Sequence, residues 1–400
     1  MIPRMPKKAM ATATSQYPSK PGLAMTPTPM VLVGQPDHRR THLLQAALQR
    51  RGLAPARVVD YTTLLDAPHR LADAVSGGVA VKLDSPGESA ALHDALVHRG
   101  WVCGGEHGAA PTPLARGELA HQQRWYAGFA ELLQALRQNA GDVRWLNAPE
   151  DILRMCDKWR CQQDLAAAGI VTPPLLGLID GYDDLRRLSE QHDCDRIFVK
   201  ARYGSSAAGV LAYRRHRDGR EIAYASTALI DDRNGPRLFN TLAPQRYADS
   251  REIATLIDAL AIQGAYAERW IAKPRAPGHA GHHFDLRVVA FDGTPRQRIA
   301  RIADRPMTNL HLGNRRSDPH ALLGASDMTA IEHCVRKAAT VFPGSAMIGF
   351  DLIPGRETSH VLEANAFGDL LPGLHWHGAD AYDDQAAWVE RRCRQDRNAA

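Results

Sequence analysis

The stretch GFDL at residues 349–352, followed by VLEANA at 361–366, decides the fold of this 400-residue chain. Each segment predicts an apolar strand that polar residues interrupt. Glu363 and Asn365 stand two apart, so both side chains project from one face, and an adjacent strand brings Asp351 beside them. Three hard oxygen donors on one face suit Mg²⁺, which completes its shell with phosphate oxygens and water. Acids that merely face solvent are the alternative, although an unpaired carboxylate inside an apolar strand is costly.

A second segment, KARYGSSAAGV at residues 200–210, joins a lysine at the end of a predicted strand to a loop of small residues. Such a loop offers backbone N–H groups and hydroxyls to a polyphosphate, and its small side chains permit close approach. It is not a Walker A loop, because Lys200 precedes the glycines. Small-residue hairpins without a ligand are common, so this segment alone leaves both interpretations open. Its candidate phosphate contacts are Lys200, Gly204, Ser205, Ser206 and Gly209.

The N-terminal part alternates strands with helices, which predicts a parallel sheet. The apolar run at 30–34 precedes a helical pattern at 41–51, and further strands fit residues 57–61 and 79–83. A helix follows the last strand to about Arg99, and a long helix is predicted over 114–138. Asp84-Ser85-Pro86-Gly87 follows a strand where a parallel sheet places ligand loops, although a structural turn explains it as well. No glycine-rich dinucleotide fingerprint follows Gly34.

The remaining chain predicts a second set of elements. A helix is expected from Pro149 to about Ala168, carrying Asp157-Lys158, and then an extended connection at 170–178. Strands are expected at 197–200, 223–230, 266–271, 285–291, 297–303, 347–353 and 360–364, with a partner strand after the turn at 234–236. Helices are expected at 250–263, capped by Ser250, at 328–341 and over the charged C-terminal 20 or so residues.

Taken in order, these segments resemble the ATP-grasp superfamily of carboxylate–amine ligases, from about Asn147 to Gly373. The resemblance points to its glutathione-synthetase and ribosomal-protein glutamate-ligase branch. It implies an α/β chain in which an ATP-grasp fold of α+β lobes follows an N-terminal parallel α/β domain. The expected divisions are a disordered tail at 1–29, the N-terminal domain at 30–145, a small lobe with linker at 146–264, a C-terminal lobe at 265–390 and a frayed end at 391–400.

The resemblance also implies a role for single residues. Lys158 and Lys200 resemble the family's two ATP lysines, and the segment from Tyr266 to Ile271 resembles its hinge strand. ATP contacts are thereby expected at Glu268, Trp270, Ile271 and Asp285, the last in a D-x-R strand with Arg287. Arg287, Arg301 and Asn309, in the N-L-x-x-G loop, are the expected catalytic residues. Asp351, Glu363 and Asn365 fall where the family holds Mg²⁺.

Departures from the family pattern concern the substrate. The relatives' loop commonly ends in paired glycines, whereas Gly313 is followed here by Asn314, Arg315 and Arg316. Phe350 stands where some relatives carry an arginine, so Arg287 or Arg301 must supply that charge. The insertion 273–283 holds three histidines without a zinc spacing, which favours a mobile lid or solvated loop. His375 and His377 on one strand face could also touch substrate.

The implied function is ATP-dependent joining of a carboxylate to an amine through an acyl phosphate, with release of ADP and phosphate. Lys158, Lys200 and Mg²⁺ would neutralise the triphosphate, and the small-residue loop would close over it. Two alternatives stay open, an ATP-grasp phosphotransferase and an ATP-binding protein without catalysis. The presence of Arg287, Arg301 and Glu363 argues for catalysis.

Composition excludes several classes of protein. Hydrophobic residues make up 44% and charged residues 23%, as in globular domains. Of the net charge of +5, four positive charges precede the first acid, Asp37, so the near-neutral body disfavours a nucleic-acid partner. Six scattered cysteines fit a reducing cytoplasm, and no apolar stretch suits a membrane helix. Small-molecule substrates are favoured, and the family resemblance suggests a homodimer.

The tail has further interpretations. Its acid-free composition resembles a transit peptide, but a plain tail, or a start codon assigned too far upstream of Met25 or Met30, is favoured.

Overall fold

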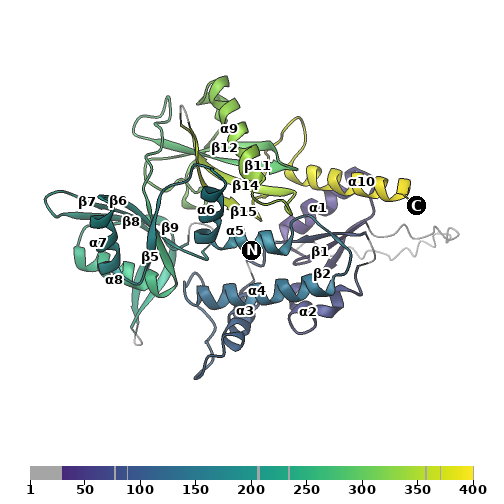
Figure 1. Cartoon of the computed structure of the whole chain (residues 1–400), viewed down its shortest axis with the longest axis horizontal. Helices are drawn as coiled ribbons and strands as arrows, with labels where there is room; N and C mark the ends of the chain where they lie inside the picture. Colours follow the sequence, from purple (N-terminus) through teal and green to yellow (C-terminus); the bar gives the residue numbers. More distant parts are fainter. Residues whose placement is uncertain are drawn as a thin grey trace, which may run out of the picture.

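The computed structural model describes residues 29–75, 78–87, 89–204, 208–232, 235–355, 358–369 and 371–399, without the side chains of residues 232, 311 and 395–399. The expected tail, apart from Pro29, lies outside these residues, as do Ser205, Ser206 and Asn234. The described chain forms three sheets, which Figure 1 shows as three neighbouring bodies with helices on their faces.

The first sheet has four parallel strands in the order β2-β1-β3-β4. These are β1 (Met30–Val33), β2 (Arg57–Val59), β3 (Ala80–Leu83) and β4 (Arg144–Trp145). Strand residues alternate between faces. Val31 and Val33 pack towards α2 (Tyr61–Leu65), α3 (Ala90–Cys103) and α4 (Gln122–Asn139), whereas Met30 and Leu32 pack with α1 (Arg39–Arg50). The alternation of strand and helix therefore produced the predicted parallel sheet.

Helices α3 and α4 touch through their backbones at Gly100 and Gly128. A Cβ atom on Gly128 would lie 2.8 Å from the Gly100 backbone nitrogen and closer still to the Leu96 carbonyl oxygen. Backbone atoms cannot rotate away as side chains do, so a methyl group must push the helices apart.

We therefore expect Gly128→Ala to lower the free energy of unfolding by about 3 kcal/mol, as overpacking does. Chemical denaturation measures this. Gly87→Ala is the control, because the nearest atom to its Cβ is the Ser85 hydroxyl oxygen at 3.3 Å. Equal stability of the two variants would contradict the backbone contact.

The second sheet has six antiparallel strands in the order β5-β10-β6-β7-β8-β9. They are β5 (Leu175–Ile179), β6 (Arg196–Ala201), β7 (Val210–Arg215), β8 (Glu221–Asp232), β9 (Gly235–Tyr247) and β10 (Ala265–Arg269). Helices α7 (Tyr182–Gln191) and α8 (Ser250–Ile262) cover one face with Leu185, Leu188, Ile253 and Leu256. The sheet extends past residue 264, where we expected the small lobe to end.

The third sheet has five antiparallel strands in the order β13-β12-β11-β14-β15. They are β11 (His283–Phe291), β12 (Thr294–Ala303), β13 (Arg315–Ser317), β14 (Met347–Ile353) and β15 (His360–Asn365). On β11, Leu286 and Val288 share a core with α9 (Ala325–Ala339). On its other face, Val289 and Phe291 pack with α1 and with α10 (Ala381–Ala399), which leaves Asp285 and Arg287 for the site.

Two predicted helices were wrong in extent. Helix α4 begins at Gln122 rather than 114, because His121 adopts a left-handed φ of 56° and Glu118 bridges to Phe239 of β9. The predicted helix from Pro149 is two helices, α5 (Pro149–Cys156) and α6 (Lys158–Ala167). Between them Asp157 is extended, and its side chain caps α6 by accepting from the Arg160 N–H.

Three smaller expectations also differ. Helix α8 is capped by Asp249, not Ser250, since its carboxylate accepts from two backbone N–H groups. His375 and His377 do not share a strand but are exposed in a connection where His377 has a φ of 49°. Short 3₁₀ turns occupy Pro68–Leu71, Leu310–Leu312 and Pro319–Ala321. Among the described residues, no helix combines the length and apolar character needed to cross a bilayer.

Candidate active site

A cleft lies between the six-stranded and five-stranded sheets, and its space, with the solvent at its mouth included, is about 690 Å³. Its lining includes the apolar side chains Pro173, Phe198, Val210, Ile271, Ile353 and Leu362 and the polar side chains Lys158, Lys200, Glu268, Lys273, Asp285, Arg301, Asn309, Asp351 and Glu363. The cleft therefore combines an apolar slot with a dense group of charges.

Two lysines from different elements, Lys158 of α6 and Lys200 of β6, each pair with a glutamate that also lines the cleft. Lys158 Nζ lies 2.6 Å from Glu363 Oε1, and Lys200 Nζ lies 2.5 Å from Glu268 Oε1. Burial alone would lower the pKa of Lys158, but the Glu363 carboxylate raises it above its ordinary value. Burial raises the pKa of Glu268, and Lys200 opposes that effect. Both lysines are therefore held close to a carboxylate inside the cleft.

Local structure fixes the first lysine. Lys158 is the first residue of α6, and its N–H donates to the Arg202 carbonyl at 3.0 Å. The Arg202 guanidinium binds both oxygens of Asp157, at 2.7 and 2.6 Å. The break between α5 and α6 thus ties Lys158 to the segment that follows β6.

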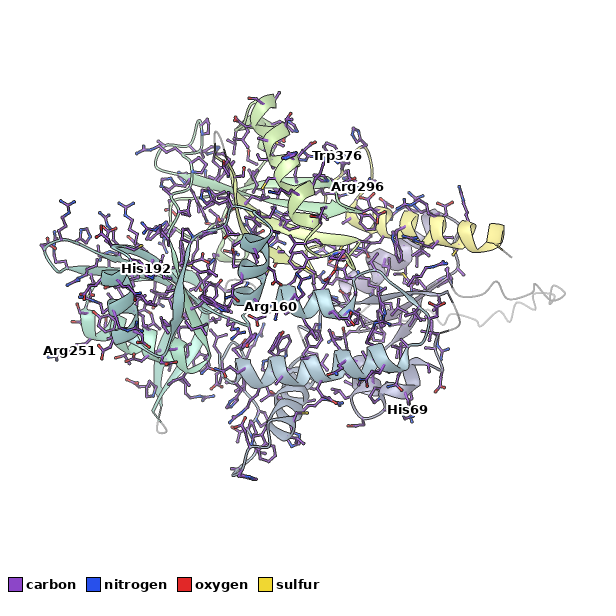
Figure 2. All side chains as sticks on the ribbon, viewed as in Figure 1. His69, Arg160, His192, Arg251, Arg296 and Trp376 are labelled. Carbon is purple, nitrogen blue, oxygen red and sulfur yellow. The ribbon has the colours of Figure 1, made fainter. Side chains whose placement is uncertain are left out.

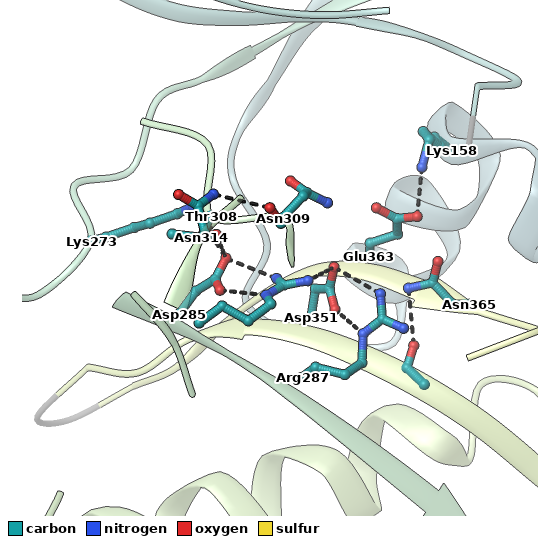
Figure 3. A network of polar contacts seen from close by, with 12 residues as sticks. Lys158, Lys273, Asp285, Arg287, Thr308, Asn309, Asn314, Asp351, Glu363 and Asn365 are labelled. Atoms are coloured by element: carbon teal, nitrogen blue, oxygen red, sulfur yellow. Dashed lines mark hydrogen bonds and ion pairs between the residues drawn. The ribbon is translucent and has the colours of Figure 1, made fainter. Parts of the chain in front are cut away.

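A chain of alternating charges crosses the floor of the cleft (Figure 3). Arg301 binds Asp285 at 2.8 and 2.9 Å and Asp351 at 3.1 Å, and Arg287 also binds Asp351. Lys273 completes the chain, 3.1 Å from Asp285. Burial would raise the pKa of both aspartates, yet their cationic neighbours hold it below the ordinary range. The register of β11 with its two neighbouring strands explains why the charges alternate, because Asp285 lies opposite Arg301 and Arg287 lies opposite Asp351.

Lys273 was not anticipated as a site residue. We placed it at the start of a mobile or solvated loop, but its side chain is only 11% exposed. Its Nζ donates to the Pro306 carbonyl at 2.9 Å and to the Thr308 hydroxyl at 2.7 Å. Burial lowers its pKa. The only signal in the sequence was its place two residues after the predicted hinge strand.

The three expected metal ligands lie on neighbouring strands. Asp351 is directly opposite Glu363, and Gly349 is opposite Asn365. The Asn365 amide nitrogen donates to the Gly349 carbonyl at 3.2 Å, and Figure 3 shows its oxygen on the side of Glu363. Among the described residues, no three His, Cys, Asp or Glu side chains are grouped to hold a metal. Two carboxylates and an amide nevertheless fit Mg²⁺, which takes few protein ligands beside phosphate.

The expected site residues separate into those that line the cleft and those that lie behind it. Lining residues are Lys158, Lys200, Gly204, Glu268, Ile271, Asp285, Arg301, Asn309, Asp351 and Glu363. Behind the lining, Arg287 binds Asp351, and Asn365 donates to the Gly349 carbonyl. Gly209 packs on Ala201. The Trp270 ring lies 5.3 Å from the ring of Phe198. Phe350 is fully buried in the core with α9, so Arg287 and Arg301 are the arginines beside Asp351.

Behind the site, a buried charge cluster joins the first and third sheets. Asp369, which follows β15, is 2.9 Å from Lys82 of β3 and also binds Arg40 of α1. Gln385 of α10 donates to it at 3.1 Å. Asp84 is likewise buried and accepts the Ser85 N–H.

This cluster predicts a pH dependence of stability. Burial would raise the pKa of Asp369, but Lys82 and Arg40 hold it well below its ordinary value. A depressed folded-state pKa adds stability above the unfolded pKa of about 3.9 that is lost as pH falls below it. In Asp369→Asn we expect the slope of unfolding free energy against pH, below about pH 4, to fall by about 1.4 kcal/mol per pH unit.

Denaturant unfolding between about pH 2.5 and 7 measures that slope. The exposed Asp37→Asn variant serves as the control and should keep the wild-type slope. A wild-type slope in Asp369→Asn would contradict the ionised cluster.

No protein-family model matches the chain, and no curated protein matches its sequence. Solved structures do resemble it. The ATP-grasp ligase PsnB, complexed with a minimal precursor, Mg and ADP, is 16% identical with a TM-score of 0.52, covering 92% of this chain and 99% of that chain. The D-cycloserine synthetase DcsG is 17% identical with a TM-score of 0.50, covering 91% and 99%.

A third similar structure is D-alanine–D-alanine ligase from Bacillus anthracis complexed with ATP, at 11% identity and a TM-score of 0.51 over 93% of this chain and 98% of that chain. At these identities the likeness is one of fold. The chain has the ATP-grasp fold, as the ordered sequence motifs predicted.

Proposed function

We propose that this chain with the ATP-grasp fold is an ATP-dependent ligase that joins a small carboxylate to an amine through an acyl phosphate. The observation that carries the proposal is the convergence of four basic side chains and four carboxylates in the lining of one cleft between two sheets, with a fifth basic side chain, Arg287, directly behind it. The basic groups are Lys158, Lys200, Lys273, Arg287 and Arg301, each within ion-pair distance of one of Glu268, Asp285, Asp351 and Glu363.

The lining of the cleft offers contacts to each part of a nucleotide. Phe198, Ile271 and Leu362 offer apolar surface to the base, and Lys158 and Lys200 offer charge to the phosphates. Glu268 is 1% exposed, and its Oε2 atom has no hydrogen-bond partner among the described residues. A buried acceptor without a donor is costly, so a hydroxyl or amino group of the nucleotide would satisfy it.

The donor set also supports a divalent cation. Asp351, Glu363 and the amide oxygen of Asn365 would hold Mg²⁺, which when bound neutralises phosphate charge. This fit rests on hard oxygen donors that face one another across β14 and β15.

Two chemical steps follow from this arrangement. A carboxylate oxygen attacks the γ-phosphorus of ATP, the bond to ADP breaks, and an acyl phosphate forms. The amine then attacks the acyl carbon, phosphate leaves, and the nitrogen loses a proton. Arg287 and Arg301 stabilise the negative oxygens of the phosphoryl group and of the tetrahedral intermediate, and Lys158 and Lys200 hold the leaving ADP. No side-chain nucleophile is required.

ADP release with Mg·ATP against pooled carboxylates plus amines tests this proposal, with products weighed by mass spectrometry. A new mass equal to acid plus amine minus water is the expected result. A gain of one phosphoryl group in a stable product would instead establish a phosphotransferase. ATP binding without turnover in any pool would favour a nucleotide-binding role.

A further inference from the structure

Arg316 lies on the face of the third sheet that carries the site. It is directly opposite Arg301, as Arg301 is opposite Asp285. Opposed residues of antiparallel strands project from the same face. Arg316 therefore extends the row of site residues onto β13, the edge strand.

The surroundings of the Arg316 guanidinium differ from those of the arginines on the neighbouring strands. Arg287 and Arg301 are both bound by carboxylates inside the cleft. Within the described part of the chain, Arg316 has no carboxylate within ion-pair distance, and it is exposed. The hydrogen bond found for its guanidinium runs from Nη1 to the Pro372 carbonyl, at 3.2 Å. Among the residues that the structure describes, the site face thus ends in a positive charge without a carboxylate partner.

Residues 366–369 and 371–380, here called the crossing segment, run from one edge of this sheet to the other. The segment leaves β15 and passes β14 at Gly368, where a Cβ atom would lie 2.7 Å from the Gly349 Cα and 3.3 Å from Arg287 Nη1. It then reaches the opposite edge, where Pro372 accepts from Arg316. Further along, Trp376 lies over the Arg298 guanidinium, in the region that Figure 2 labels with Arg296. The crossing segment therefore forms a wall beside Arg287 and Arg316.

The loop before β13 holds Arg316 in register. Gly313 adopts a φ of 78°, which an L side chain rarely tolerates, and the next residue, Asn314, reaches back across the loop. Its amide nitrogen donates to the carbonyls of Met307 and Asn309, both at 3.0 Å. Because Asn309 lines the cleft, the loop couples the cleft wall to the strand that carries Arg316. Figure 3 shows Asn314 beside Thr308 at this corner of the site.

We propose that Arg316 recognises an anionic group, a carboxylate or a phosphate, on the substrate that binds between β12–β13 and the crossing segment. This inference rests on the proposed function and narrows its substrate class. The anion is one that the reaction does not consume, because the reacting carboxylate must lie by Arg287 and Arg301. Such substrates include acidic amino acids, phosphorylated amino acids and peptides with a free C-terminus.

The test compares Arg316→Ala with Arg315→Ala. Arg315 is the matched control, since it is the exposed neighbour on the same strand and lies opposite Ile302, on the other face. ADP release is measured with Mg·ATP and substrate pairs that differ only in one anion. Suitable pairs are glutamate with glutamine, aspartate with asparagine, phosphoserine with serine, and peptides with free or amidated C-termini.

Wild type should prefer the anionic member of a pair, and Arg316→Ala should reduce this preference in kcat/KM about ten- to hundredfold. The KM for ATP should stay unchanged, and Arg315→Ala should keep the preference. Equal turnover of both members by wild type, or equal effects of the two variants, would overturn the inference and leave the ligase intact. Absence of both ADP release and binding of a non-hydrolysable ATP analogue would overturn both proposals.

Discussion

Glu363→Gln is expected to lower kcat/KM about a thousandfold while the protein stays folded. The substitution keeps the shape of the side chain and removes its charge. That charge faces Asp351 across β14 and β15 and pairs with Lys158 at 2.6 Å. Without it the proposed Mg²⁺ site loses one of two carboxylates, and a lysine in the cleft loses its partner. Steady-state ADP release with the substrates found in the pooled assay measures the effect.

Two further measurements separate chemistry from folding. The Mg²⁺ concentration that gives half-maximal rate should rise in Glu363→Gln, which a purely structural role would not cause. Glu332→Gln is the control, because this glutamate on α9 also pairs with a basic side chain, Arg298 at 2.6 Å, but outside the cleft. Wild-type turnover in Glu363→Gln, or an equal loss in Glu332→Gln, would contradict the assignment. Lys200→Ala should cause a loss of similar size, mainly through a higher KM for ATP.

The strands that carry the site could be predicted from the sequence because each polar residue interrupts an apolar run. Asp351 lies within a buried strand and Glu363 within a half-buried one, and the two-residue spacing of Glu363 and Asn365 placed both on one strand face. The ion-pair partners of Asp351 and Glu363 could not be predicted. The Lys158–Glu363 pair joins residues 205 positions apart, and no local pattern encodes that contact.

Long-range contacts also explain the errors in the helices. Residues 114–121 have apolar spacing that favours a helix, but a turn at 116–117, the bridge between Glu118 and β9 and the left-handed φ of His121 keep them out of one. At Asp157 the predicted helix breaks because its carboxylate caps α6 and binds Arg202. Lys273 was missed for the same reason, since its partners are brought in by β11 and by the loop after β12.

Arg301→Met is expected to lower the free energy of unfolding by about 3–5 kcal/mol at neutral pH. The Arg301 side chain is 6% exposed and binds Asp285 and Asp351, which are 1% and 5% exposed. Methionine keeps the apolar stem and removes the guanidinium, so two buried carboxylates each lose a cation. Lys273 and Arg287 remain beside them and limit the loss. Denaturant unfolding followed by circular dichroism measures the change.

The depressed pKa values of Asp285 and Asp351 determine how the destabilisation by Arg301→Met changes with pH. Cationic neighbours depress the pKa of Asp285 and Asp351, so the stability they add is present above about pH 4 and is lost as pH falls. The effect of Arg301→Met should therefore be largest near pH 7 and shrink towards pH 3, where protonation removes the unpaired charge. Arg298→Met, on the same strand, is the control and should cost about 1 kcal/mol, because Glu332 is 30% exposed and can be hydrated. If Arg301→Met were equally destabilising at pH 3 and pH 7, lost packing rather than uncompensated charge would account for the effect.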